Sequence, residues 1–382
     1  MAANTNINDR LGLIYAIYVR AHTPEGTFKA IIPDLERIKA LGTDIIWLMP
    51  IHPIGVENKK GSLGCPYSIS DYRAVNPAYG TMDDFIELTE AIHKLGMRCI
   101  IDVVYNHTSY DALLKREHPE YYFHHENGDF GNKIGAWSDV CDLDYNNKEL
   151  WKYQIDSLKF WAQYVDGFRC DVASLVPLDF WVQARAEVEK VRPNSFWLAE
   201  TMRDHEVHRV NLTGVHAWKD FELYEAFDAE YQYDIMSCLD AVWDGRGTME
   251  DYLARLNQQE VIYPDNYIKM RYLENHDIRR FASVFNNPRR RSEWLRFMFF
   301  QKGIMQIYAG EEFSNEHLPS LFEREPIDRC GEDISKEIAS LAAAKKKIPA
   351  DALFNAWIED GVVKAEYVLR GKRVALETFD IM

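Results

Sequence analysis

Arg169 and Asp171 stand two residues apart in the segment VDGFRCD (165–171), at the end of an apolar run typical of a β-strand. Side chains along a strand alternate between its two faces, so the guanidinium of Arg169 and the carboxylate of Asp171 point the same way. A neighbouring cation lowers the pKa of a carboxyl group and orients it. Asp171 is therefore predicted to be an ionised nucleophile.

Three further apolar runs also end in acidic residues, in the segments DVVYNH (102–107), FWLAE (196–200) and YLENHD (272–277). One arginine–aspartate pair on a strand is more often structural than catalytic. Four such strand ends in a single chain favour a shared site. The side chains that these three additional segments bring to the predicted site are His107, Glu200, His276 and Asp277.

Several carboxylates around one pocket cannot all ionise easily, because like charges raise at least one pKa. Glu200 has no cation beside it in the sequence, so we expect it to stay protonated and to donate a proton. Asp102 lies inside its strand and is predicted to be a structural partner of Arg169 rather than a catalyst.

The net charge and the aromatic content of the chain indicate what kind of partner or ligand it binds. The 382 residues carry a formal net charge of −16, which argues against a nucleic acid or an anionic membrane surface as the partner. Hydrophobic residues make up 47% of the chain, as in a globular protein, and no apolar run approaches the roughly 20 residues of a membrane span. The ten Trp and 21 Tyr residues suit a neutral ligand that stacks on aromatic rings, such as a sugar.

Cysteine usage and the N-terminal segment bear on location. The six cysteines are scattered without CxxC or other metal-binding spacing, which indicates a reducing compartment. Residues 1–10 lack the basic and apolar regions of a signal peptide, so the protein is expected in the cytoplasm. His118, His124 and His125 have no matching ligand spacing, and no metal site is predicted from them.

The order of apolar and helical segments predicts the fold class. Near-continuous apolar strands, as in a buried parallel sheet, alternate with segments of helical periodicity. Strands are expected at 11–19, 43–50, 98–105, 165–170, 195–199, 226–230, 267–273 and 304–308. Helices are expected at 30–41, 82–95, 148–164, 178–191, 233–242, 248–258, 292–301 and 332–348. Eight such units predict an α/β protein, a (β/α)₈ TIM barrel built from residues 1–106 and 148–350.

Two segments depart from the barrel pattern. Residues 107–147 are rich in His, Tyr, Asn, Gly and Asp without a clear period, and they are predicted to form an inserted domain after the third strand. Residues 351–382 alternate apolar and polar positions around an Arg-Gly-Lys turn, which predicts a small C-terminal antiparallel β-sheet. Since the carboxyl ends of barrel strands meet at one face, the acidic strand ends would converge there.

The ordered motifs DVVYNH, GFRCD, the strand end at Glu200 and ENHD resemble those of the α-amylase superfamily, glycoside hydrolase family 13. The resemblance covers residues 11–348. Asp142-Leu143-Asp144 also looks like the motif near the end of that family's inserted domain B, and Tyr67 is similar to its sugar-stacking tyrosine. The resemblance implies catalytic roles for Asp171 as nucleophile, Glu200 as acid/base and Asp277 as transition-state stabiliser.

The resemblance further implies that Tyr67, His107, Arg169 and His276 bind the substrate. Many relatives hold calcium between the barrel and domain B, using the asparagine that is Asn106 here and a polar residue at the position of Leu175. With leucine at that position, no metal or other cofactor is expected.

The implied function is a retaining hydrolase of α-1,4 bonds in malto-oligosaccharides or starch-like α-glucans, with α-1,6 bonds as a further substrate class. The sequence leaves open a transglycosylase or a sucrose- or trehalose-acting enzyme, which would share the three carboxylates. It also leaves open a glucan-binding barrel without catalysis, although such proteins usually lose a catalytic carboxylate. Oligomeric state cannot be read from these features.

Overall fold

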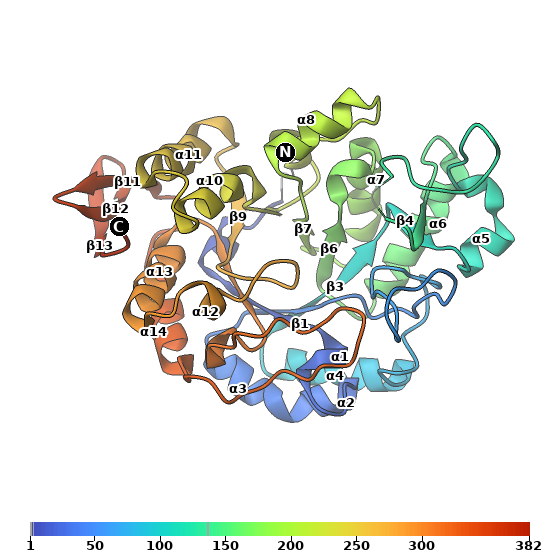
Figure 1. The fold of residues 1–382 in the computed structure, drawn as a ribbon, viewed down its shortest axis with the longest axis horizontal. Helices are drawn as coiled ribbons and strands as arrows, with labels where there is room; N and C mark the ends of the chain where they lie inside the picture. The colour runs from blue at the N-terminus through green and yellow to red at the C-terminus, as the bar shows by residue number, and fades with distance from the viewer. Residues whose placement is uncertain (1, 3, 136) are drawn as a thin grey trace.

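The computed structural model describes residue 2, residues 4–135 and residues 137–382. Eight parallel strands close into a barrel in the spatial order β1-β10-β9-β8-β7-β6-β3-β2 (Figure 1). Their bounds are β1 (Leu13–Ile17), β2 (Ile45–Leu48), β3 (Arg98–Val104), β6 (Gly167–Asp171), β7 (Phe196–Ala199), β8 (Ala229–Tyr231), β9 (Ile268–Arg271) and β10 (Ile304–Tyr308). The predicted barrel is thus confirmed.

The strands form where the sequence places short runs of apolar and β-branched residues, and the helices of the outer ring cover them. β1 and β2 are buried along their whole length. Strand six is the main displacement: it was predicted at 226–230 and lies at Ala229–Tyr231. Glycine is required at position 167, at the start of β6, because a Cβ there would lie 1.9 Å from the carbonyl oxygen of Phe196 on the neighbouring strand.

Helices surround the barrel in the order in which they follow the strands (Figure 1). Their bounds are α1 (Val19–His22), α2 (Phe28–Ile31), α3 (Leu35–Ala40), α4 (Met82–Lys94), α6 (Lys148–Trp161), α7 (Leu178–Val188), α8 (Asp204–Leu212), α9 (Asp220–Leu223), α10 (Tyr233–Trp243), α11 (Met249–Ile262), α12 (Phe281–Val284), α13 (Pro288–Phe300) and α14 (Ser335–Lys345).

Two of the helical segments that differ from the sequence prediction show why such differences arise. The helix predicted at 30–41 is divided into α2, a 3₁₀ turn at Ile32–Asp34 and α3, because Pro33 has no N–H to donate within a continuous helix. α8 was not predicted at all. Only Val207 and Val210 of α8 are buried, so its sequence carries too little helical periodicity to be recognised.

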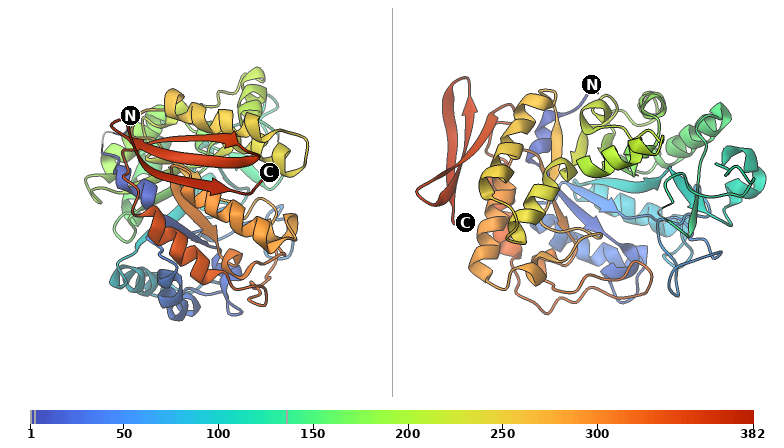
Figure 2. Two further views of the ribbon diagram at one scale, coloured as in Figure 1. Left: turned by 90° about the vertical axis from the view of Figure 1, so that its left-hand side faces the viewer. Right: turned by 45° about the horizontal axis from the view of Figure 1, so that its top comes forward.

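The segments predicted to lie outside the barrel carry their own small sheets. β4 (His107–Ser109) pairs with β5 (Val140–Asp142), and between them lies α5 (Leu113–Glu117). At the C-terminus, β11 (Leu353–Glu359), β12 (Val362–Leu369) and β13 (Lys372–Phe379) form an antiparallel sheet. Figures 1 and 2 show the two additions on opposite sides of the barrel. The residue limits of the domains stay predictions.

Candidate active site

Arg169 occupies the centre of the predicted site. β3 and β6 pair with Asp102 opposite Arg169, so both side chains enter the barrel at one level. Nη1 of Arg169 donates to Oδ1 of Asp102 and to Oδ1 of Asp171, each at 2.8 Å. Nε donates to the hydroxyl of Tyr231 at 3.2 Å. The guanidinium is fully buried, and the predicted shared face of Arg169 and Asp171 is confirmed by this contact.

Glu200 follows the last residue of β7 and lies closer to this cation than the sequence indicated. Its Oε2 is 2.9 Å from Nη2 of Arg169, an ion pair whose geometry falls outside that of a hydrogen bond. Oε2 also accepts a hydrogen bond of 2.9 Å from the backbone N–H of Val172. The expectation that Glu200 has no cation beside it is therefore wrong, because folding brings Arg169 to it from the next strand.

Tyr67, His276 and Asp277 form a second connected group. The hydroxyl of Tyr67 lies 2.7 Å from Nε2 of His276 and donates to Oδ2 of Asp102 at 3.1 Å. The Tyr67 and His276 rings are stacked, with centroids 5.5 Å apart. Nε2 of His276 pairs with Oδ2 of Asp277 at 3.1 Å, and the Asp277 side chain is 40% exposed. Two loops far apart in the sequence thus join at the site.

His107 lies at the junction of the barrel and the inserted segment. It opens β4, where it pairs with Asp142, and its ring lies 5.4 Å from the Trp137 ring. Burial lowers the pKa of His107, although the charge of Asp142 opposes this effect. A neutral imidazole that lines the cleft can donate or accept a hydrogen bond.

Burial dominates the pKa values of the two carboxyl groups with proposed chemistry. It raises the pKa of Asp171 to about 6, against the attraction of Arg169 and with help from the charge of Asp102. It raises the pKa of Glu200 to about 7, again against Arg169 and with help from Asp171. The expected lowering of the Asp171 pKa is wrong in its net direction, since desolvation outweighs the guanidinium. The pKa of Glu200 is still higher than that of Asp171, which makes Glu200 the better proton donor of the two.

Asp277 has the opposite character. Burial acts to raise the pKa of Asp277, but the positive charge and hydrogen bond of His276 outweigh it, so this pKa lies below its usual range. Burial acts to lower the pKa of His276, but the charge and the hydrogen bond of Asp277 together outweigh it, so this pKa is raised. Asp277 is therefore an anion at the mouth of the site, where it can face developing positive charge.

All three predicted catalytic carboxylates line a single cleft of about 540 Å³ with Tyr67 and His107, whereas Arg169 and His276 lie behind its surface. Sequence reasoning missed several other residues of its walls: Lys60, Trp137, Asp139, Arg203, Glu206, Arg209, Tyr233, Leu321 and Phe322. Most lie in loops without periodicity. Tyr233 could have been found, because it follows strand six in the aromatic segment YQY (231–233).

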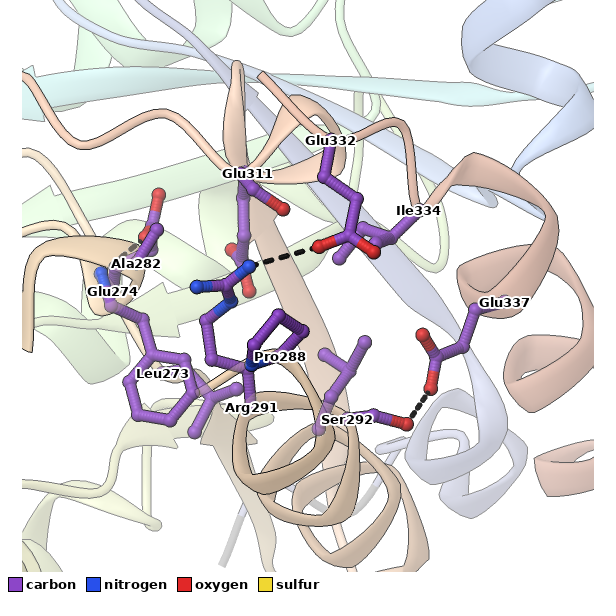
Figure 3. Close-up of a pocket in the computed structure, with 13 residues that line it drawn as sticks. Leu273, Glu274, Ala282, Pro288, Arg291, Ser292, Glu311, Glu332, Ile334 and Glu337 are labelled. Carbon is purple, nitrogen blue, oxygen red and sulfur yellow. Dashed lines mark hydrogen bonds and ion pairs between the residues drawn. The ribbon is translucent and has the colours of Figure 1, made fainter. Parts of the chain in front are cut away.

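A second cavity of about 300 Å³ lies between α12, α13 and the segment before α14 (Figure 3). Arg291 pairs there with Glu332 at 2.9 Å, and Ser292 donates a hydrogen bond to Glu337. Glu274 of the ENHD motif reaches this cavity, where it pairs with Arg280. None of the seven predicted site residues lines it, so its carboxylates hold helices and loops together away from the cleft.

The barrel–domain junction does not fit a calcium ion. Oδ1 of Asp142 accepts from the amide of Asn106 at 3.3 Å, and Oδ2 accepts from the backbone N–H of Lys133 at 2.8 Å. The Lys133 ammonium lies beside them and donates to the carbonyl oxygen of Leu143 at 2.8 Å. Protein donors thus already bond these carboxylate and carbonyl oxygens, and one of the donors is a cation. Within the described residues no cluster of His, Cys, Asp and Glu has metal-binding geometry.

The sequence profile described as "Alpha amylase, catalytic domain" matches residues 3–351. The chain belongs to the α-amylase family. Among solved structures, it is similar to an α-amylase from Lactobacillus plantarum, with 45% identity, a TM-score of 0.93, and coverage of 96% of this chain and 87% of that one. This α-amylase family member therefore shares its fold with that structure over almost its whole length.

Curated relatives of this family member include both hydrolases and transferases. Alpha-amylase MalA of Haloarcula japonica is 26% identical over 88% of this chain and 49% of its own length. A cyclomaltodextrin glucanotransferase of a Bacillus species is 26% identical over 85% of this chain and 50% of its own. The chain spans about half the length of these relatives. In the part of the chain that the structure describes, no helix is long and apolar enough to cross a membrane.

Proposed function

We propose that this protein is a retaining α-glycoside hydrolase that cleaves α-1,4 bonds of malto-oligosaccharides or related α-glucans. The observation that carries the proposal is the position of Asp171 and Glu200 on the two terminal nitrogens of one buried guanidinium, that of Arg169. Retaining enzymes need two carboxyl groups only about 5–5.5 Å apart, and this shared contact favours such proximity over the wider spacing of inverting enzymes.

In the first step, Asp171 attacks the anomeric carbon while Glu200 gives its proton to the glycosidic oxygen. The carbon–oxygen bond breaks, the leaving sugar departs as an alcohol, and a glycosyl ester remains on Asp171. In the second step, the Glu200 carboxylate takes a proton from water, and the resulting hydroxide breaks the ester at the same carbon. Two inversions return the original anomeric configuration.

The remaining side chains support this sequence of steps. Asp277, ionised through its pair with His276, stabilises positive charge on the ring in both transition states. Tyr67, whose ring is held by His276, offers an aromatic face to the sugar bound beside Asp171. The free state of the six cysteines supports a cytoplasmic location.

A glucan transferase is the second candidate, because the relatives of this chain include a cyclomaltodextrin glucanotransferase. It would use the same ester on Asp171, with a sugar hydroxyl in place of water. The acceptor alone separates the two activities.

Product analysis tests the proposal. The purified protein is incubated with maltoheptaose, with panose and with sucrose, and anomers are followed by NMR. Shorter maltodextrins released first as α-anomers are expected, and β-anomers would contradict retention. Products longer than the starting sugar would assign the transferase, and turnover of panose would add α-1,6 activity. A protein that turns over none of these sugars would be a glucan-binding barrel at most.

A further inference from the structure

We propose that one end of the catalytic cleft is closed by a wall of three chain segments, so that the enzyme acts from the non-reducing end of a glucan and releases short products. The wall consists of residues 59–66 after β2, residues 317–325 before α14, and Asp139 of the inserted segment. Figures 1 and 2 show the first two segments meeting beside the barrel mouth. This inference rests on the proposed function.

Hydrogen bonds join the first two segments directly. The N–H of Leu63 donates to the carbonyl oxygen of Phe322 at 3.1 Å. The N–H of Ser62 donates to the Glu323 carboxylate at 2.7 Å, and its hydroxyl donates to the other oxygen of that carboxylate. Gly61 lies so close that a Cβ would be 2.5 Å from the Cβ of Phe322. The two loops therefore form one tight seam.

A buried arginine holds this seam from beneath. Nη1 of Arg20 donates to the carbonyl oxygens of Gly64 and Leu321, each at 3.2 Å, and Nη2 donates to that of Leu63 at 3.4 Å. The hydroxyl of Tyr18 donates to the same Leu321 carbonyl at 3.0 Å. Arg20 is only 6% exposed and lies in α1, the short helix that follows β1, so the barrel anchors both loops.

A third tie extends the wall to the inserted segment. Nζ of Lys60 pairs with Oδ1 of Asp139 at 2.7 Å, and the Asp139 side chain is nearly buried. Lys60 and Asp139 both line the cleft, as do Leu321 and Phe322. One loop is thus fastened to the inserted segment on one side and to the loop before α14 on the other.

Residues of the wall also border a second hollow, of about 370 Å³, which is lined by Arg20, Leu63 and Arg324 among others. Lys60, Cys65 and Phe322 face the cleft instead. Leu63 of the seam lines this hollow and Phe322 of the seam lines the cleft, so opening the seam is expected to lengthen the space available to a bound chain.

The position of Glu200 tells which end of the substrate meets the wall. Glu200 protonates the leaving oxygen, so the leaving sugar lies on the Glu200 side of the cleft. That side is lined by Arg203 and by the exposed Arg209 of the α8 segment. The sugar attached to Asp171 lies on the other side, against Tyr67. The wall segment 59–66 comes directly before Tyr67 in the sequence and contributes Cys65 to the cleft, so it is expected to stop the glycone, the non-reducing part of the chain.

The size of the cleft agrees with short products. A volume of about 540 Å³ falls in the range of sites that enclose one drug-sized ligand, which corresponds to a few sugar rings and not to a long helix of glucan. With one end closed, only a chain end can enter between Tyr67 and the wall. Each cleavage then releases a short piece of fixed length.

A blocked substrate tests the inference. Rates are compared on p-nitrophenyl α-maltoheptaoside and on the same compound with an ethylidene group on the non-reducing glucose. The wild-type enzyme is expected to cleave the blocked compound about a hundredfold more slowly, because the added group meets the wall. Equal rates on the two compounds would overturn the inference and leave the proposed function intact. Turnover of neither would instead contradict the proposed function.

Paired variants test the wall itself. The double variant Lys60→Ala and Glu323→Ala removes two side-chain ties of the wall, Lys60–Asp139 and Ser62–Glu323, and is expected to raise the blocked-to-free rate ratio about tenfold. The matched control is Lys59→Ala with Glu325→Ala, whose side chains bond only within their own loops. The control should keep the wild-type ratio. A rise of equal size in both double variants would overturn the role of the ties, and thermal melting checks that each variant is folded.

Discussion

The backbone N–H of Val172 donates a hydrogen bond of 2.9 Å to Oε2 of Glu200. Val172 adopts the left-handed region, with φ 42° and ψ 43°, which costs a β-branched residue about 1–2 kcal/mol. Since Oε2 also faces the Arg169 guanidinium, a proton on Glu200 is expected on Oε1. The strained residue after the proposed nucleophile thus fixes which oxygen of the proposed acid can donate.

Glu200→Gln keeps the shape of this side chain and removes its proton. The rate on malto-oligosaccharides should fall about 10²–10⁴-fold, because the leaving oxygen is no longer protonated. An α-glucosyl fluoride needs little proton donation, so its first step should be far less affected. Comparison of kcat/KM on the two substrates checks this, and equal losses on both would contradict the acid role.

Asp171→Asn removes the proposed nucleophile without changing the volume of the side chain. Activity on both glucans and activated substrates should fall at least about 10³-fold, since no glycosyl ester can form. Asp179→Asn on the exposed face of α7 serves as the matched control and should keep full activity. Mass spectrometry of the wild type with a slow fluorosugar should detect the ester. A fully active Asp171→Asn enzyme would remove Asp171 from the mechanism.

The pH profile should be narrow. Activity needs ionised Asp171, with a pKa of about 6, and protonated Glu200, with a pKa of about 7. The kcat/KM value should therefore fall as pH drops below about 6 and fall again as pH rises above about 7. The two apparent pKa values of this profile belong to the coupled pair of carboxyl groups. In Glu200→Gln, assayed on an activated substrate, the alkaline fall should vanish. Its persistence would assign that limb to another group.

Chelation should leave the protein unchanged. Lys133 supplies the cation at the barrel–domain junction, so excess EDTA is expected to alter neither activity nor melting temperature. Lys133→Met should lower the free energy of unfolding by about 1–3 kcal/mol, since the Leu143 carbonyl oxygen then loses its charged donor. Urea titration measures this difference, with the exposed Lys152→Met as the control. A loss of activity in EDTA that calcium restores would show a metal requirement.

The barrel and its acidic strand ends were predictable because they depend on local patterns. Arg169 and Asp171 share a face through strand geometry alone, and strands such as β10 were predicted at their observed bounds. The contact between Glu200 and Arg169 was not predictable, because it depends on how β6 and β7 pair across 31 residues of sequence. The net pKa shift of Asp171 was missed for a related reason. Burial is a property of the folded barrel, and it outweighs the neighbouring cation.

Contacts between loops could not be predicted for a different reason. The seam between Ser62 and Glu323 joins segments 261 positions apart through turns that carry no period. Helix α8 was also not predicted, since only two of its residues are buried and its sequence shows little helical periodicity.

The cluster on Arg169 also has a consequence for folding equilibria. The pKa values of Asp102, Asp171 and Glu200 all lie above those of the unfolded chain, mainly because the groups are buried. Between about pH 4 and pH 7 these three groups therefore bind more protons in the folded protein than in the unfolded chain. For these groups, stability is fully present at acid pH and declines as pH rises through their folded pKa values. Proton uptake on refolding is thus built into the same carboxylates that are proposed to break the glycosidic bond.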